Sequence, residues 1–183
     1  MELKNKDWKV GFNASMFMLL GLFLFQACAS GPKFLSFTGG RLPPDKYQRV
    51  TIQNFFNDSP GGPANLGIDF TERLKEYYQR NTPLSLVDAT PHIELSGSIT
   101  NYGVTPVAPS AGDIQQAQLQ RLTITVKVDY VDYVDDAKSF NSNFSFFQDF
   151  NANQTLEEVE TELIDIIFDQ IVFDIFNKTY ANW

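Results

Sequence analysis

The segment Leu122-Thr123-Ile124-Thr125-Val126-Lys127-Val128-Asp129-Tyr130 alternates apolar and polar side chains without exception. Successive side chains of a strand point to opposite faces of a sheet. The pattern therefore predicts a β-strand with one face on a core and the other open to water or to a partner. A sheet face that is simply solvated would show the same pattern, and both interpretations stay open. The candidate contact residues on the open face are Arg121, Thr123, Thr125 and Lys127.

Strand patterns continue on both sides of this segment. Apolar and polar residues alternate over 93–102, and phenylalanines follow the same pattern over 140–146, after a polar turn at 135–138. Phe147 breaks that alternation and predicts a bulge. The stretch 104–119 is long for a hairpin connection and predicts a loop, of the kind that is often functional or disordered.

Closer to the N-terminus, three short strands are expected at 34–38, 50–56 and 84–87. Between the last two, apolar residues recur at helical spacing over 66–78. This periodicity predicts a helix, which must end before Pro83.

A second helix is expected near the C-terminus. It begins with Thr155-Leu156-Glu157-Glu158, a capping box in which the Thr and Glu side chains satisfy backbone groups at the helix start. Apolar residues then cover a wide arc, so burial against a sheet is expected. These elements predict an α+β fold, a two-layer sandwich with two helices on one face of a mostly antiparallel or mixed sheet of about four strands. Residues 34–183 suffice for one such domain.

The first 27 residues have the pattern of a secretory signal peptide. Lys4, Lys6 and Lys9 make the start basic, and residues 16–25 hold no polar side chain. A ten-residue helix rises only about 15 Å, half of the roughly 30 Å hydrocarbon core, so a membrane-spanning anchor is the weaker alternative. We expect residues 1–27 to be removed.

Cys28, the only cysteine, follows this segment directly. A lone cysteine in an exported chain cannot form an internal disulfide. The segment Phe25-Gln26-Ala27-Cys28 resembles a bacterial lipobox, which implies that Cys28 is acylated as the mature N-terminus and that residues 28–33 form a tether. At about 0.8 kcal/mol per buried methylene, two or more acyl chains hold a protein at a membrane.

The charge of the mature chain restricts its partners. The sequence has 14 basic and 22 acidic side chains; residues 1–27 hold three and two of them, which leaves 11 against 20 and a net charge of −9. Such a domain is not expected to bind nucleic acid, or to bind an anionic membrane surface through charge.

No pattern predicts catalysis. His92 is the only histidine, and the sequence has no nucleophile elbow, phosphate loop or His/Cys metal cluster, so we expect no enzyme, no cofactor and no metal. Glu158, Glu162, Asp165 and Asp169 share one helix face, where a solvated surface is a simpler explanation than a metal or acid/base site. Around a turn lie Asp129, Asp132, Asp135 and Asp136, but the ligand spacing and the glycine of an EF-hand are absent, so a calcium loop is not expected. A hydrolase that uses such acids ranks last among the functions considered.

Three stretches carry a family resemblance: Phe37-Thr38-Gly39-Gly40 with Pro43-Pro44, then 121–128, then 174–183. Together, and in this order, they resemble the LptE family of outer-membrane lipopolysaccharide-assembly lipoproteins in its Bacteroidetes-type form. The resemblance implies a small sandwich that lies in the lumen of the outer-membrane β-barrel LptD, which it plugs and helps to assemble. Contact with lipopolysaccharide is implied as well, and the polar inner wall of such a barrel suits a plug with a polar exterior.

Contact with anionic lipopolysaccharide would need basic residues in an acidic domain. Arg121 and Lys127 are the candidate pair on one strand face, and Arg41, Lys46 and Arg49 form a second cluster in the sequence.

The expected location is the periplasmic face of the outer membrane. Residue 29 is alanine and not the aspartate associated with inner-membrane retention, and no acidic run precedes Asp45. The alternative function is a stand-alone periplasmic lipoprotein that binds a lipid or a small amphiphile on its sheet face.

Overall fold

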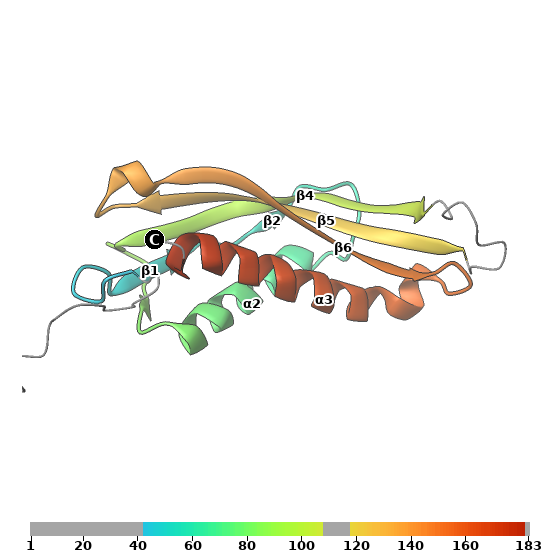
Figure 1. Cartoon of the computed structure of the whole chain (residues 1–183), viewed down its shortest axis with the longest axis horizontal. Coiled ribbons are helices and arrows are strands. Elements are labelled where there is room, and N and C mark those ends of the chain that lie inside the picture. Colours follow the sequence, from blue (N-terminus) through green and yellow to red (C-terminus); the bar gives the residue numbers. More distant parts are fainter. Residues whose placement is uncertain (1–41, 108–117, 182–183) are drawn as a thin grey trace, which may run out of the picture. The chain divides into compact units, whose positions relative to one another are not determined.

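A computed structural model describes residues 42–107 and 118–181, all within one unit of the chain, Gly39–Trp183. A six-stranded sheet forms one layer, and two helices lie against one of its faces (Figure 1). The predicted α+β class and two-layer arrangement are confirmed. The predicted count of about four strands is too low, because two short strands add to it. The strand expected at 34–38, the leader and the tether lie outside the described residues.

The strands and helices have the following bounds. They are β1 Arg49–Ile52, β2 Phe56–Asn57, α2 Leu66–Asn81, β3 Ser85–Leu86, β4 Ile93–Val107, β5 Leu119–Asp132, β6 Phe140–Asn151 and α3 Leu156–Phe176, with short turns of helix at Asp136–Lys138 and Asn177–Ala181.

The sheet is mixed. Its order is β3-β1-β4-β5-β6, with β2 pairing the same side of β4 as β1. The β1, β2 and β3 pairings are parallel, whereas β4-β5-β6 is an antiparallel meander of long strands. The single strand predicted over 50–56 is two strands, because β1 ends at Ile52 and β2 begins at Phe56. The loop predicted over 104–119 is wrong at both ends, since β4 extends to Val107 and β5 already begins at Leu119.

The bulge predicted at Phe147 is also wrong. The β5–β6 register is continuous, and Phe147 stands opposite Thr123 on the open face of the sheet. The irregularity lies in β4 instead, where the register shifts between Ile99 and Asn101. The alternation of apolar and polar residues breaks because the open face carries an aromatic side chain at 147. It does not break because β6 contains the extra residue of a bulge.

The predicted alternation of β5 is confirmed. Leu122, Ile124, Val126 and Val128 are fully buried on the face that the helices cover. Burial of such side chains stabilises the fold by about 1.5–3 kcal/mol each, so this strand anchors the core.

Helix α2 approaches the β1–β2 connection closely at Gly67. A Cβ atom at this position would lie 2.4 Å from the carbonyl oxygen of Phe55, so only glycine fits. One turn later, the Thr71 hydroxyl accepts a hydrogen bond from the Phe55 N–H at 2.9 Å and donates one to the Gly67 carbonyl at 2.7 Å. These contacts hold the helix against the sheet, where the Phe70 ring packs between Phe55 and Phe168.

Helix α3 begins where the sequence predicts. The capping box of Thr155 and Glu158 is formed, with both side chains bonded to backbone N–H groups. The wide apolar arc is buried between the sheet and α2, through Leu163, Ile164, Ile167, Phe168, Ile171, Val172 and Ile175. Across 42–107 and 118–181, neither helix combines the length and apolarity that a membrane crossing requires.

Candidate functional site

The open face of the sheet carries all four predicted contact residues. Their register positions on β5 alternate with those of the buried residues, so they lie on the face opposite the one that packs on the core. Figure 1 shows α2 and α3 on a single side of the sheet. Small polar side chains surround them on the neighbouring strands, including Ser98 of β4 and Asn143 and Ser145 of β6. The centre of this face is therefore polar, with Phe147 exposed opposite Thr123.

Arg121 is already engaged within the sheet. Its Nε and Nη2 donate to the two carboxylate oxygens of Asp149 at 2.7 and 2.9 Å, and its guanidinium carbon lies 3.6 Å from the centre of the Phe147 ring. This hydrogen bonding holds the pKa of Asp149 below its usual range and raises the pKa of Arg121. Arg121 is thus positioned by two hydrogen bonds to Asp149 and by the Phe147 ring, and the Asp149 carboxylate balances its charge.

The other three candidates form weaker contacts. The Thr125 and Ser145 hydroxyls lie 2.9 Å apart, and the Thr123 carbonyl accepts a hydrogen bond from the Asn101 side chain at 3.2 Å. Lys127 Nζ lies 3.9 Å from a carboxylate oxygen of Asp129, and both side chains are more than 40% exposed. Lys127 is therefore the basic group on this face that a partner can recruit with the least rearrangement.

The second basic cluster is only partly described, since Arg41 lies outside the described ranges. Arg49 Nη2 lies 3.3 Å from His92 Nε2, and the His92 Nδ1 accepts the Gln48 backbone N–H at 3.0 Å. His92 thus joins β1 to the start of β4, which is a structural role.

The acidic turn contains a buried carboxylate. Asp132 is 1% exposed; one of its oxygens accepts the Tyr47 hydroxyl at 2.9 Å, and the other accepts the backbone N–H groups of Val134 and Asp135. Burial, followed by the hydrogen bond to Asp132, raises the pKa of Tyr47. The carboxylate organises the turn and does not face solvent. The buried residues of β5 occupy even-numbered positions, and Asp132 is the next one after Tyr130. This alternation in the sequence could have predicted that Asp132 is buried.

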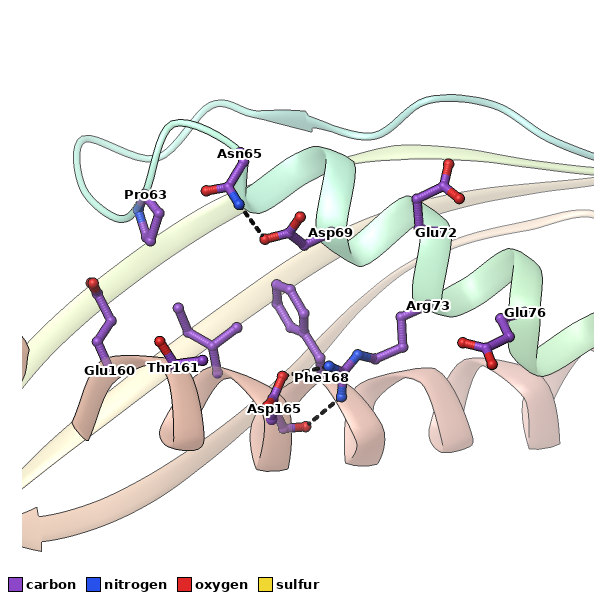
Figure 2. Close-up of a pocket in the computed structure, with 11 residues that line it drawn as sticks. Pro63, Asn65, Asp69, Glu72, Arg73, Glu76, Glu160, Thr161, Asp165 and Phe168 are labelled. Carbon is purple, nitrogen blue, oxygen red and sulfur yellow. Dashed lines mark hydrogen bonds and ion pairs between the residues drawn. The ribbon is translucent and has the colours of Figure 1, made fainter. Parts of the chain in front are cut away.

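A polar groove separates the two helices (Figure 2). Its volume is about 600 Å³, and its lining includes Asp69, Glu72, Glu76, Glu160 and Asp165. Figure 2 shows Arg73 of α2 reaching across to Asp165 of α3.

Arg73 is the basic residue that joins the helices across this groove. It bonds Asp165 and donates to an Asp169 carboxylate oxygen at 2.7 Å. Partial burial lowers the pKa of Arg73, but the hydrogen bonds and charges of Asp169 and Asp165 outweigh that and raise it. Three of the four acids predicted on this helix face are therefore structural, since Glu158 already forms the capping box. Sequence reasoning missed the bridge, because it depends on which helix faces meet.

In the described part of the chain, no group of three or more His, Cys, Asp or Glu side chains could hold a metal ion. Glu160 in the groove accepts the Tyr102 hydroxyl at 2.5 Å, a contact that ties α3 to β4. The described residues thus form a polar sheet face and an acidic groove that Arg73 bridges.

Comparison with known proteins gives one family. A sequence model of the LptE family, described as lipopolysaccharide-assembly, matches residues 47–179. No curated protein matches.

Three solved structures are similar in part. A minor lipoprotein from Acinetobacter baumannii is 14% identical, with a TM-score of 0.45 over 72% of this chain and 91% of its own. A hypothetical protein from Chlamydia trachomatis is 12% identical, with a TM-score of 0.49 over 74% and 99%. An uncharacterized lipoprotein B from Nitrosomonas europaea is 18% identical, with a TM-score of 0.46 over 83% and 92%. The family assignment rests on the sequence match alone.

Proposed function

The chain belongs to the LptE family of lipopolysaccharide-assembly proteins, and from this membership we propose that it is the lipoprotein subunit that plugs and stabilises the LptD barrel. In this role it binds and orders another protein and catalyses no reaction.

The observation that carries the proposal is the chemistry of the open sheet face. Hydroxyl and amide side chains cover its centre, and its Arg121 charge is balanced by Asp149. The inner wall of a large outer-membrane barrel is polar. A surface of short polar side chains can exchange its bound water for hydrogen bonds with such a wall, and a charge already paired is not left unpaired when water is excluded.

The same surface argues against the alternative. Binding of a lipid or a small amphiphile requires apolar area for the hydrocarbon part. The predicted contact face of β5 instead presents Thr123, Thr125 and Lys127, and the exposed aromatic residue beside them, Phe147, is covered on one side by the Arg121 guanidinium.

The anchor is part of the proposal. Acylation of Cys28 at the end of a removed leader would place the domain on the periplasmic face of the outer membrane. The tether would then position the domain beside a barrel in the same membrane.

Contact with lipopolysaccharide, where it occurs at this face, involves Lys127 and not Arg121. An anionic group that recruited Arg121 would have to displace a bidentate carboxylate and a ring contact. Lys127 has only the longer approach to Asp129. Photocrosslinking from position 127 should yield a lipid adduct, and labelling of the barrel alone would limit the protein to scaffolding.

Co-purification tests the proposal directly. The native protein, solubilised in detergent, should come out with a large, heat-modifiable barrel protein, and its depletion should remove lipopolysaccharide from the cell surface. Cys28→Ala should remain an unlipidated precursor. If the protein purifies alone and its depletion leaves surface lipopolysaccharide unchanged, the plug function is wrong.

A matched pair of variants locates the contact face. Thr125→Glu places an unpaired charge at the centre of the open face and should reduce recovery of the barrel at least about tenfold, since a buried unpaired charge weakens an interface strongly. The control is Gln79→Glu at an exposed position of α2, which makes the same change of one charge outside the sheet. Equal loss in both variants would show that the open face is not the contact.

A further inference from the structure

The outer edge of β6 differs from the other edges of the sheet. β6 is the last strand in the sheet order, and within 42–107 and 118–181 it pairs only with β5. It is 12 residues long and its register is unbroken. At the opposite end of the sheet, β3 has only two residues.

The backbone groups along this edge can be assigned by alternation. The N–H of Ala152, just after β6, bonds to the carbonyl of Gln118 at 2.8 Å. In an antiparallel pair, hydrogen-bonded and non-bonded positions alternate. Even-numbered residues of β6 therefore bond to β5, and the N–H and C=O groups of 141, 143, 145, 147 and 149 point outward.

The sequence of β6 itself has none of the residues that protect an edge strand, and the lysine that contacts it, Lys178, lies over its first half only. Proteins prevent unwanted pairing with proline, lysine, a bulge or a very short strand. The sequence Phe140–Asn151 contains no proline, lysine or arginine, and its single charge, Asp149, is bound by Arg121. By contrast, the open second half of β4 has a register shift after Ile99 and a proline at 106.

From these observations we propose that the edge of β6 pairs with β6 of a second copy of this chain, antiparallel about a twofold axis through Ser145. This interaction is independent of the proposed function and describes the protein outside any barrel. Twofold pairing requires an edge that is complementary to itself.

The side chains satisfy that requirement. About Ser145, Asn141 stands opposite Asp149 of the second copy on the open face. Each side chain already has a partner within its own chain, Asp129 for Asn141 and Arg121 for Asp149, so neither brings an unpaired charge to the contact. On the helix side, Phe144 stands opposite Phe146 of the second copy. Both rings are only partly buried in the single chain, and aromatic cross-strand pairs stabilise a sheet. No like charges of the strand itself face each other. The Lys178 ammonium lies beside the first half of the edge, where it donates to the Ser142 hydroxyl and lies over the Phe140 and Phe144 rings, away from the twofold axis at Ser145.

Sedimentation of the mature lipoprotein in detergent tests the proposal. The wild type should show a concentration-dependent dimer. Asn143→Pro removes one outward N–H from each copy and leaves the bonds to β5 intact, so it should raise the dimer dissociation constant at least about tenfold with an unchanged circular dichroism spectrum. If Asn143→Pro fails to fold, Ser145→Lys places two like charges on the axis and should have the same effect.

Disulfide trapping tests the register. Under mild oxidation, Ser145→Cys should form a covalent dimer, whereas Glu76→Cys, on an exposed position of α2, should not. The wild type controls for Cys28. A monomeric wild type would overturn the proposal, and so would a dimer that survives Asn143→Pro and is not trapped at 145. Loss of barrel co-purification alone would count against the proposed function and not against this edge.

Discussion

The two faces of β5 are stabilised by different interactions. On the covered face, Leu122, Ile124, Val126 and Val128 are fully buried. On the open face, Arg121 and Thr125 hold partners on the neighbouring strand β6, at Asp149 and Ser145. The covered face gains stability from buried area, which is not directional. The open face gains mainly specificity, from contacts that each depend on strand register.

The two faces should therefore lose unequal amounts of unfolding free energy when a phenylalanine is replaced by alanine. Phe70→Ala would remove a fully buried ring that packs on Phe55 and Phe168, and it should cost about 3–5 kcal/mol of unfolding free energy. Phe147→Ala makes the same chemical change on the open face, where the ring is 43% exposed, and should cost far less. Urea denaturation of both variants measures the difference. Similar losses would mean that the two faces are not energetically distinct.

The same comparison applies to two carboxylates of β5, the buried Asp132 and the exposed Asp129. Asp132→Ala would leave the Tyr47 hydroxyl and two backbone N–H groups without their buried acceptor, at a cost of about 1–3 kcal/mol or more. Asp132→Asn keeps one acceptor oxygen and should lose less. Asp129→Ala, on the open face, is the control and should change stability little. A greater loss in the Asp129 variant would contradict the assignment of faces.

The same contrast explains which features the sequence could predict. Strict alternation identified β5, helical periodicity identified α2, and the capping box placed the start of α3, because each signal is local. The end of β4 was missed because Pro106 suggests a loop, although a proline is tolerated on the side of a strand where no other described strand pairs.

The contacts of the open face depend on distant residues. Arg121 and Asp149 are 28 positions apart, and only the β5–β6 register brings them together. The bridge from Arg73 to Asp165 likewise depends on how two helices pack. Sequence patterns predicted where Arg121 points. They could not predict that its charge is already balanced.

Thr125→Ala should separate stability from binding. The substitution removes one exposed hydrogen bond to Ser145, so the unfolding free energy should change by no more than about 0.5 kcal/mol. Barrel recovery should nevertheless fall if the open face is the contact surface. A large loss of stability, measured by thermal denaturation, would show that this face also supports the core.

The smallest expected effect is the pH dependence of the Arg121–Asp149 pair. The hydrogen bond from Arg121 lowers the pKa of Asp149 in the folded state, below the value of about 3.9 in an unfolded chain. The folded state therefore binds this proton less readily than the unfolded state does. The stabilising contribution of the Arg121–Asp149 pair is complete above about pH 4 and is lost as the pH falls through the folded pKa of Asp149.

Compared with Asp149→Asn, the wild type should be more stable at neutral pH. The difference in unfolding free energy should shrink in acid and in high salt, because both side chains are near solvent. Urea denaturation of both proteins across that pH range measures this difference in unfolding free energy. A difference that grows in acid would mean that the Asp149 carboxylate destabilises the open face.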